Sequence, residues 1–243
     1  MRQLSSHAGS GSTERRRSRT YRAVGCTTAP VLKTGWATGP MPLRRERSAR
    51  RAEVLALDSR GVHGVIFTSF RDYLLSAHGN DTATAVFGAE PEYLLSESYP
   101  DESFVRLVEL AAAHTGLEPD EIVFELGVFT AEVTFARLYP AFFDVSSSTR
   151  DFLLTVETRI HELVRATIPH AGPPRLDITP LGDDGVSILY ESPRRMCVLL
   201  RGLTEGAARH YGEHAEMEER ACMLRGDPAC AFDVSFSLGS PSA

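Results

Sequence analysis

The spacing of apolar residues changes at Pro173 and Pro174, and this change constrains the fold more than any other feature of the sequence. Before the two prolines, apolar residues recur at helical spacing, whereas after them they alternate as in β-strands. The sequence therefore predicts an α+β fold. We expect a helical N-terminal lobe, followed by a C-terminal lobe with a mostly antiparallel sheet.

Apolar spacing, capping residues and turn residues together predict the individual elements. Five helices are expected before the prolines, at residues 66–77 (closed by Gly79 and Asn80), 100–115, 119–127, 130–138 (halted by Pro140) and 149–168 (capped by Ser148 or Thr149). After the prolines we expect paired strands at 176–181 and 186–190, a helix at 196–210, and a hairpin of 215–223 with 230–236.

Charge divides the chain into two parts. Residues 1–60 hold 13 Lys or Arg against 4 Asp or Glu, whereas residues 61–243 hold 13 against 28. The first part is rich in Arg, Ser, Gly and Thr and has no apolar period, which predicts a disordered basic tail. An arm that binds nucleic acid and an extension from an upstream start site are the alternatives, but the near absence of aromatic residues makes nucleic acid unlikely as a partner. We expect one domain at 61–237 and a flexible C-terminus at 238–243.

The sequence also indicates the cellular compartment in which the protein is expected. No apolar run approaches the ~20 residues that a membrane span needs. No apolar segment follows the early arginines, as it would in a secretory signal. A cytoplasmic, reducing location is therefore expected, and the four cysteines are not expected to form structural disulfides. They are Cys26, Cys197, Cys222 and Cys230.

Tyr190, Ser192 and Arg194 alternate along the chain, so an extended strand would point them to the same side. They offer a fork of donors with no competing carboxylate, which suits a ligand with two anionic groups. Heme is such a ligand, and its iron binds imidazole. His161, on the helix predicted at 149–168, is the candidate ligand, and His170 is its competitor. A solvated strand edge and an ordinary boundary histidine are the alternatives.

Seven segments, read in order, resemble the heme nitric-oxide-binding family, the H-NOX proteins. They are Gly64 to Phe67, His78 to Asp81, Tyr99 to Asp101, Tyr139 to Phe143, Phe152 and Leu153 with His161, Pro173 to Leu176, and the triplet. The resemblance runs from about Val62 to Phe236. It implies that His161 is the proximal ligand of heme b and that Pro174 presses on the heme and distorts it.

The resemblance also bears on the distal side of the heme. In oxygen-binding relatives a tyrosine five residues after the triplet arginine stabilises bound O2, whereas this sequence has Leu199 there. Phe70 takes the place of a distal aromatic residue, and Thr130 is the nearest hydroxyl. We therefore expect an apolar distal pocket that binds NO and CO and excludes O2.

Signalling is expected to begin at the iron. NO weakens the bond trans to itself, so the bond to His161 stretches or breaks, strain against Pro174 relaxes, and the lobes shift. Because six residues follow the domain, the output is expected to act in trans, on a histidine kinase or a cyclic-di-GMP enzyme. We expect no enzyme activity, because Phe70 and Leu199 offer no distal acid or base and the sequence has no hydrolase motif or phosphate-binding loop.

The C-terminal hairpin suggests a second metal. Cys222 and Cys230 lie at its base, and Cys197 lies on the adjoining helix. Some H-NOX relatives bind a structural zinc through four cysteines, and Glu219 stands at the fourth position here. The alternative is three reduced cysteines in a packed lobe. The same hairpin also resembles small-molecule-binding domains of the vinyl-reductase type, so a heme-free binding module is the alternative function.

Overall fold

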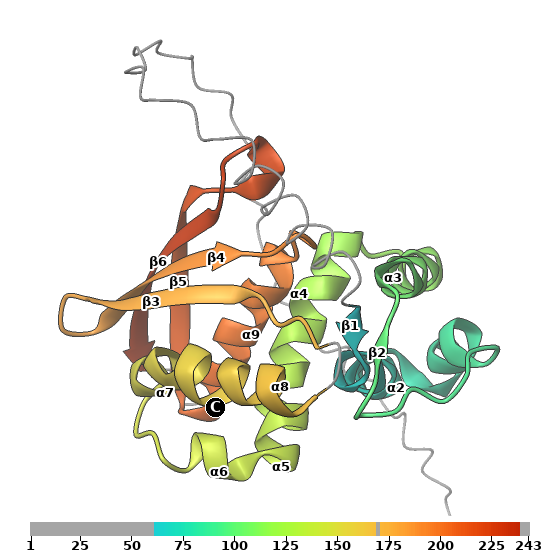
Figure 1. Ribbon diagram of the computed structural model, residues 1–243. Helices are drawn as coiled ribbons and strands as arrows, with labels where there is room; N and C mark the ends of the chain where they lie inside the picture. Colours follow the sequence, from blue (N-terminus) through green and yellow to red (C-terminus); the bar gives the residue numbers. More distant parts are fainter. Residues whose placement is uncertain (1–60, 169–170, 239–243) are drawn as a thin grey trace, which may run out of the picture. The chain divides into compact units, whose positions relative to one another are not determined.

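A computed structural model describes residues 61–168 and 171–238 (Figure 1). Some predictions concern residues outside this part: the basic tail at 1–60 with Cys26, His170, and the last five residues. The helical segments, in chain order, are α2 (Gly64–Phe87), α3 (Asp101–Thr115), α4 (Pro119–Phe129), the π-helix η1 (Thr130–Phe135), α5 (Ala136–Leu138), α6 (Pro140–Phe143), α7 (Thr149–Thr155), the π-helix η2 (Val156–His161), α8 (Glu162–Thr167), α9 (Cys197–His210) and the 3-10 turn η3 (Met223–Arg225). The strands are β1 (Val62–His63), β2 (Ser98–Tyr99), β3 (Arg175–Leu181), β4 (Gly185–Glu191), β5 (Glu213–Ala221) and β6 (Cys230–Leu238).

Capping residues explain where several helices begin and end. Asp101 lies in the first turn of α3, where its charge complements the helix dipole, and Gly116 ends the helix in the left-handed conformation. The hydroxyl of Ser148 accepts from the N–H of Asp151 and caps α7, as predicted. Gly79, at φ +84°, interrupts α2 where a stop was predicted, but the helix resumes and ends at Phe87.

The predicted stop at Gly127 is wrong. Helical structure continues from α4 through η1 to the end of α5 at Leu138, just before Pro140. A glycine often marks the end of a helix, but Gly127 lies inside one and allows α9 to pack closely against it. A Cβ on Gly127 would lie 2.7 Å from the carbonyl oxygen of Leu199 and 2.8 Å from the nitrogen of Leu203, so α4 and α9 pack backbone to backbone.

The strands that follow Pro173 and Pro174 form one antiparallel sheet in the order β3-β4-β6-β5. Its inward residues, such as Ile188 and Phe232, are buried together with Phe152 of α7 and Leu200 of α9. A second core joins Phe67 and Phe70 of α2 to residues of α3 and α4, and it also includes Leu199 of α9. We call the part with β1, α2, β2 and α3 the helical lobe, and the part with the sheet and α6 to α8 the sheet lobe.

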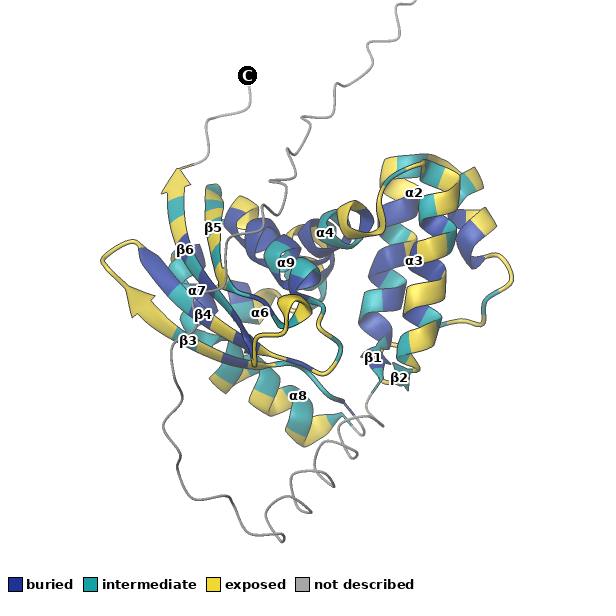
Figure 2. Cartoon of the chain, turned by 90° about the horizontal axis from the view of Figure 1, so that it is seen from above, coloured by how far each residue is buried: buried dark blue, intermediate teal, exposed yellow. Residues whose placement is uncertain are grey.

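Helices α4 and α9 lie between the two lobes in both views (Figures 1 and 2). Figure 2 shows buried residues running along these two helices. The core of the helical lobe includes Ile122 of α4 and Leu199 of α9, whereas the core of the sheet lobe includes Leu200 of α9. This arrangement confirms the α+β fold with a helical lobe followed by a sheet lobe. None of the helices in the described residues is long and apolar enough to span a membrane.

The α4–α9 contact yields a stability prediction. In a Gly202→Ala variant the new Cβ would lie 2.1 Å from the carbonyl oxygen of Phe124, so the helices must separate. We expect the free energy of unfolding to fall by about 1–3 kcal/mol, measured by urea denaturation. Ser76→Ala, at an exposed position of α2, is the control and should change stability little. Equal stability of the two variants would show that the contact between the helices tolerates a side chain.

Candidate heme-binding site

His161 is the last residue of η2, and its side chain is 15% exposed. A π-helix inside a longer helix is uncommon and occurs often at functional sites. The ring nitrogen Nδ1 lies 3.0 Å from Oε2 of Glu157, one turn earlier on the same helix. Burial lowers the pKa of His161, and this effect outweighs the opposing effect of its hydrogen bond to Glu157. The neutral imidazole is therefore favoured, which is the form that binds a metal.

Glu157 connects His161 to the start of the sheet. Its Oε2 also accepts from the backbone N–H of Leu176, at 3.1 Å. Its Oε1 pairs with Arg165, at 2.8 Å, and Arg165 donates in turn to the carbonyl oxygen of Pro174, at 3.0 Å. Burial alone would raise the pKa of Glu157, but the bonds from His161, Arg165 and Leu176 lower it. We call these five residues the proximal network.

The triplet lies where β4 turns into α9. Because β4 ends at Glu191, Tyr190 is the only residue of the triplet on the strand. Tyr190 and Ser192 are nevertheless both buried, whereas Glu191 and Pro193, which follow them in turn, are exposed. The predicted alternation of sides therefore persists beyond the end of the strand. Arg195 then adopts φ +53°, a left-handed conformation that costs a residue with a side chain about 1–2 kcal/mol. Such strain is frequent at functional sites.

The two hydroxyls of the triplet accept hydrogen bonds from the turn that follows them. Tyr190 accepts from the N–H of Met196 at 3.1 Å, and Ser192 from the N–H of Arg194 at 3.3 Å. Burial raises the pKa of Tyr190 to about 12, so its hydroxyl stays protonated at neutral pH. In these two contacts each hydroxyl uses a lone pair. The side chains of Tyr190 and Ser192 also hydrogen-bond to each other, which leaves one of their two hydroxyl protons for a carboxylate ligand.

Arg194 does meet a carboxylate, contrary to the expectation that nothing would compete for it. Its Nε donates to Oδ1 of Asp101, the first residue of α3, at 2.8 Å. Its two terminal nitrogens donate to the carbonyl oxygens of Gly172, at 2.8 Å, and Gly61, at 3.0 Å. A guanidinium has five N–H groups, so these three bonds leave two for another anion.

The strand register brings the predicted residues together. Leu176, which binds Glu157, pairs with Tyr190 across β3 and β4. Arg194 holds Gly172 and Arg165 holds Pro174, so the segment between them is fixed from two sides. His161, Pro174 and the triplet, which the sequence could only name separately, thus belong to one connected region.

On the predicted distal side, Phe70 and Leu199 are both buried in the core of the helical lobe. The rings of Phe70 and Phe87 meet edge to face, with centroids 5.6 Å apart. Thr130 is bonded through its hydroxyl to Ser69, which also bonds Thr134, each at 2.8 Å. All three hydroxyl residues are fully or almost fully buried, and we call them the hydroxyl cluster.

Cys197 of α9 and the two cysteines of the C-terminal hairpin form a compact, buried group. The Sγ atoms of Cys197, Cys222 and Cys230 all lie within 4.8 Å of one another, and the thiols are free. Burial, followed by the neighbouring thiols, raises the pKa of Cys197 to about 12. Glu219 is not part of this group. Its carboxylate pairs with Arg225.

Sequence reasoning missed Glu157, Asp101 and the partners of Thr130. Glu157 carried a local signal, because residues four apart share a helix face. Asp101 carried none, since 93 positions separate it from Arg194. Ser69 and Thr134 carried a weak signal. Ser69 is a small polar residue next to Phe70, and Thr134 lies one turn after Thr130 on the same helical segment.

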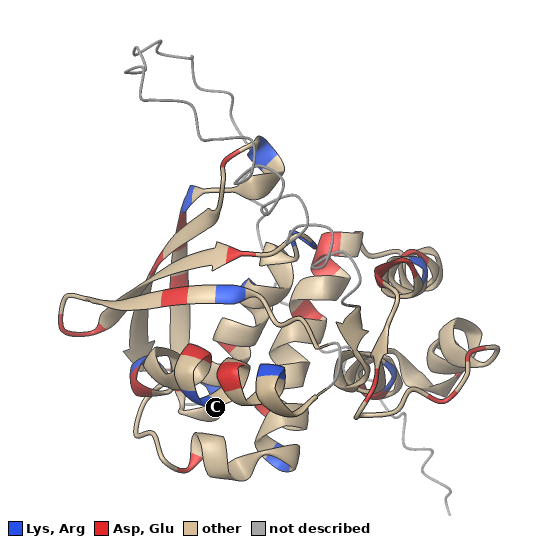
Figure 3. Cartoon of the chain, in the orientation of Figure 1, with Lys and Arg blue, Asp and Glu red and all other residues tan. Residues whose placement is uncertain are grey.

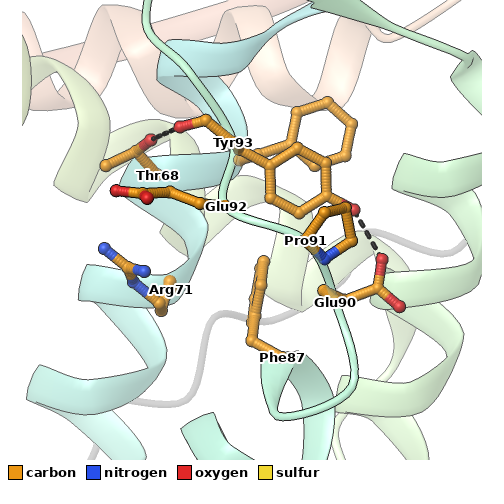
Figure 4. A pocket seen from close by; sticks show the side chains of 8 residues that line it. Thr68, Arg71, Phe87, Glu90, Pro91, Glu92 and Tyr93 are labelled. Atoms are coloured by element: carbon orange, nitrogen blue, oxygen red, sulfur yellow. Dashed lines mark hydrogen bonds between the residues drawn. The ribbon is translucent and has the colours of Figure 1, made fainter.

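Two other features of the surface bear on what the chain can bind. A pocket of about 290 Å³ opens in the helical lobe, between α2 and the segment at 87–93, and Figure 4 shows Arg71 and Glu92 facing it. None of the predicted heme-site residues lines it. Acidic residues lie on the turn after β3, on α7 and α8 and on β5 (Figure 3), and this net negative charge opposes binding to nucleic-acid phosphates.

The donor set of the region fits heme. Nδ1 of His161 lies at hydrogen-bond distance from Glu157, and the ring also has a hydrogen bond to the backbone of Pro174. Nε2 is the nitrogen that would bind iron. The hydroxyl proton that the Tyr190–Ser192 pair leaves free and two N–H groups of Arg194 match the two carboxylates of a heme edge. The structure therefore offers, within one connected region, both kinds of group that heme requires.

Comparisons with known proteins agree with this chemistry. The sequence model of the haem-NO-binding (HNOB) family matches residues 63–219. A search among curated protein sequences gave no significant match. Among solved structures, an H-NOX protein from S. oneidensis in the Fe(II)NO state is 20% identical, with a TM-score of 0.67 over 72% of this chain and 99% of that one.

Two further structures show the same fold. Unliganded Fe(II) H-NOX from K. algicida is 20% identical, with a TM-score of 0.62 over 75% of this chain and 100% of that one. An oxygen-binding H-NOX domain related to soluble guanylate cyclases is 23% identical, with a TM-score of 0.64 over 75% and 98%. At these identities the likeness concerns the fold, whereas the family match covers more than half of the sequence. The chain belongs to the haem-NO-binding family, the H-NOX proteins, which are heme-based gas-binding sensors.

Proposed function

We propose that the chain binds heme b through His161 and senses NO. The observation that carries the proposal is the connection of His161 through Glu157 and Leu176 to the strand that bears Tyr190. In this proposal the hydroxyls of Tyr190 and Ser192 and the free N–H groups of Arg194 bind the heme carboxylates. Pro174, whose carbonyl Arg165 holds, would press on the heme and distort it.

We further propose that the distal side admits NO and CO and excludes O2. Bound O2 is stabilised by a hydrogen-bond donor, and neither Phe70 nor Leu199 supplies one. Thr130, the hydroxyl named from the sequence, is already bonded to Ser69. Both observations support an apolar distal surface.

The signal in this proposal is a movement of His161. His161 would hold the iron of bound ferrous heme, and that iron would be the site at which NO binds and loosens the hold of His161. His161 is then free to move with η2, and Glu157 and Arg165 pass that movement to Leu176 and Pro174 at the start of β3. A ligand that favours one of two arrangements in this way shifts the balance between them.

The remaining expectations belong to this proposal. Residues 61–237 would form the sensor domain, between a basic tail at 1–60 and a flexible end at 238–243. The domain would have no enzyme activity of its own and would signal in trans to a histidine kinase or a cyclic-di-GMP enzyme, the partner classes that the family suggests. A cytoplasmic location stays a prediction.

The test is an absorption spectrum of the reduced protein under anaerobic conditions and after separate exposure to NO, CO and air. We expect a five-coordinate ferrous heme that binds NO and CO and is unchanged by brief exposure to O2. His161→Ala should lose the heme unless imidazole is supplied, because the iron then lacks its protein ligand. His170→Ala, which removes the competing histidine, should keep it.

Other outcomes would overturn parts of the proposal. A stable oxy spectrum in air would contradict the exclusion of O2. The hydroxyl cluster would then be the candidate hydrogen-bond donor to bound O2. A protein that takes up no heme when heme is supplied would refute the sensor and favour the heme-free binding module of the vinyl-reductase type.

We also propose a zinc ion at Cys197, Cys222 and Cys230. Three thiol sulfurs within 4.8 Å match the soft ligands that zinc prefers. Because Cys197 has a pKa of about 12 without metal, zinc must displace its proton, and binding should weaken as the pH falls. Glu219 can complete the set only if it leaves Arg225.

Metal analysis of protein purified without a histidine tag tests this site. We expect one zinc per chain in the wild type and none in Cys222→Ser. Cys26→Ser, which removes a cysteine of the predicted tail, is the matched control and should keep the zinc. Retention of zinc in Glu219→Gln would exclude Glu219 as a ligand, and a wild type that binds no added zinc would refute the site.

A further inference from the structure

The ring of His161 is in direct contact with a carboxylate that the proposed sensing mechanism uses only to transmit movement. Glu157 precedes His161 by four residues, and the two side chains meet on one face of η2. Oε2 of Glu157 lies 3.0 Å from Nδ1 of His161, which is hydrogen-bond distance. The contact is on the side of the ring opposite to Nε2, the nitrogen that would bind iron.

Other groups fix this carboxylate in place. The N–H of Leu176 donates to the same oxygen, and Arg165 binds the other oxygen at 2.8 Å. The side chain of Glu157 is only 25% exposed, so water competes little for it. An acceptor that is already held by two further partners loses little conformational freedom when it binds the histidine.

We propose that Glu157 is a positioning residue that accepts the Nδ1–H of His161 and strengthens the bond of His161 to heme iron. This inference rests on the proposed function, since it assumes that His161 is the iron ligand. An anionic acceptor fixes the tautomer in which Nε2 carries the lone pair, and it makes the imidazole a stronger electron donor. Both effects favour the histidine remaining on the iron when NO binds on the other side.

Arg165 acts in the opposite direction, because its positive charge draws electron density from the same carboxylate. Two features make its effect the smaller one. Arg165 binds Oε1, whereas His161 binds Oε2 directly. The guanidinium is 28% exposed, so solvent screens part of its charge. The net effect of Glu157 is therefore a stronger iron–histidine bond.

Glu157→Gln tests the inference, because it keeps the shape and removes the charge. Glu162→Gln, at an exposed position just after His161 in the sequence, removes the same charge without touching the ring and is the matched control. Resonance Raman spectra of the ferrous, unliganded protein measure the iron–histidine stretching frequency, and redox titration measures the midpoint potential. We expect a lower frequency and a higher potential in Glu157→Gln, and wild-type values in Glu162→Gln.

The NO complex gives a third measurement, the ratio of six-coordinate to five-coordinate heme. We expect this ratio to fall about tenfold in Glu157→Gln. In the heme-free protein, ¹⁵N spectra of histidine should show His161 with its proton on Nδ1, and Glu157→Ala should lose this preference.

The outcomes distinguish a failure of the role of Glu157 from a failure of the proposed heme sensor. If Glu157→Gln and Glu162→Gln have the same stretching frequency and potential as the wild type, Glu157 does not act on the iron ligand, although the sensor stands. If the wild type has no heme bound through His161, the proposed function fails first.

Discussion

The contacts of Arg194 hold together the parts of the structure on which the site depends. Its guanidinium, with a side chain only 9% exposed, binds the first residue of α3, the carbonyl of Gly172 and the carbonyl of Gly61. These partners come from the helical lobe, from the segment before β3 and from the first residue of the described domain. A planar cation with five donors can satisfy so many acceptors at once, whereas a lysine could not do so in fixed directions.

The same contacts matter for a switch. In the proposed sensor, two N–H groups of Arg194 meet the heme carboxylates while three others hold the protein. The position of the cofactor is then coupled to Asp101 of the helical lobe through one side chain. Arg165 holds Pro174 in a comparable way from the helix that carries His161. In the proposed sensor, a movement of the heme would therefore reach both lobes, as a two-state sensor requires.

The packing of α4 against α9 is the rigid part of the arrangement. Gly127 and Gly202 let the two backbones touch, and α9 contributes Leu199 to one core and Leu200 to the other. Closely packed interiors shift between discrete arrangements more readily than they deform. The hydroxyl cluster adds a polar contact between α2 and η1, in a core that is otherwise apolar.

The sequence by itself predicted the longer helices and strands in their order and the α+β class, because periodicity, caps and turn residues act over a few neighbouring positions. It did not predict the short elements β1, β2 and α6. The family followed from the resemblance of seven segments. Two helix ends were predicted too early, at residue 77 and at Gly127. Local signals cannot distinguish a glycine that ends a helix from one that only interrupts it or admits a second helix. The sequence also named His161, Pro174 and the triplet. Only the tertiary structure decided that Asp101 meets Arg194 and that Thr130 is bonded to Ser69. It also showed that Glu219 lies outside the cysteine group. These contacts depend on which distant residues the packing of the two lobes brings within hydrogen-bond distance, and no local pattern encodes that.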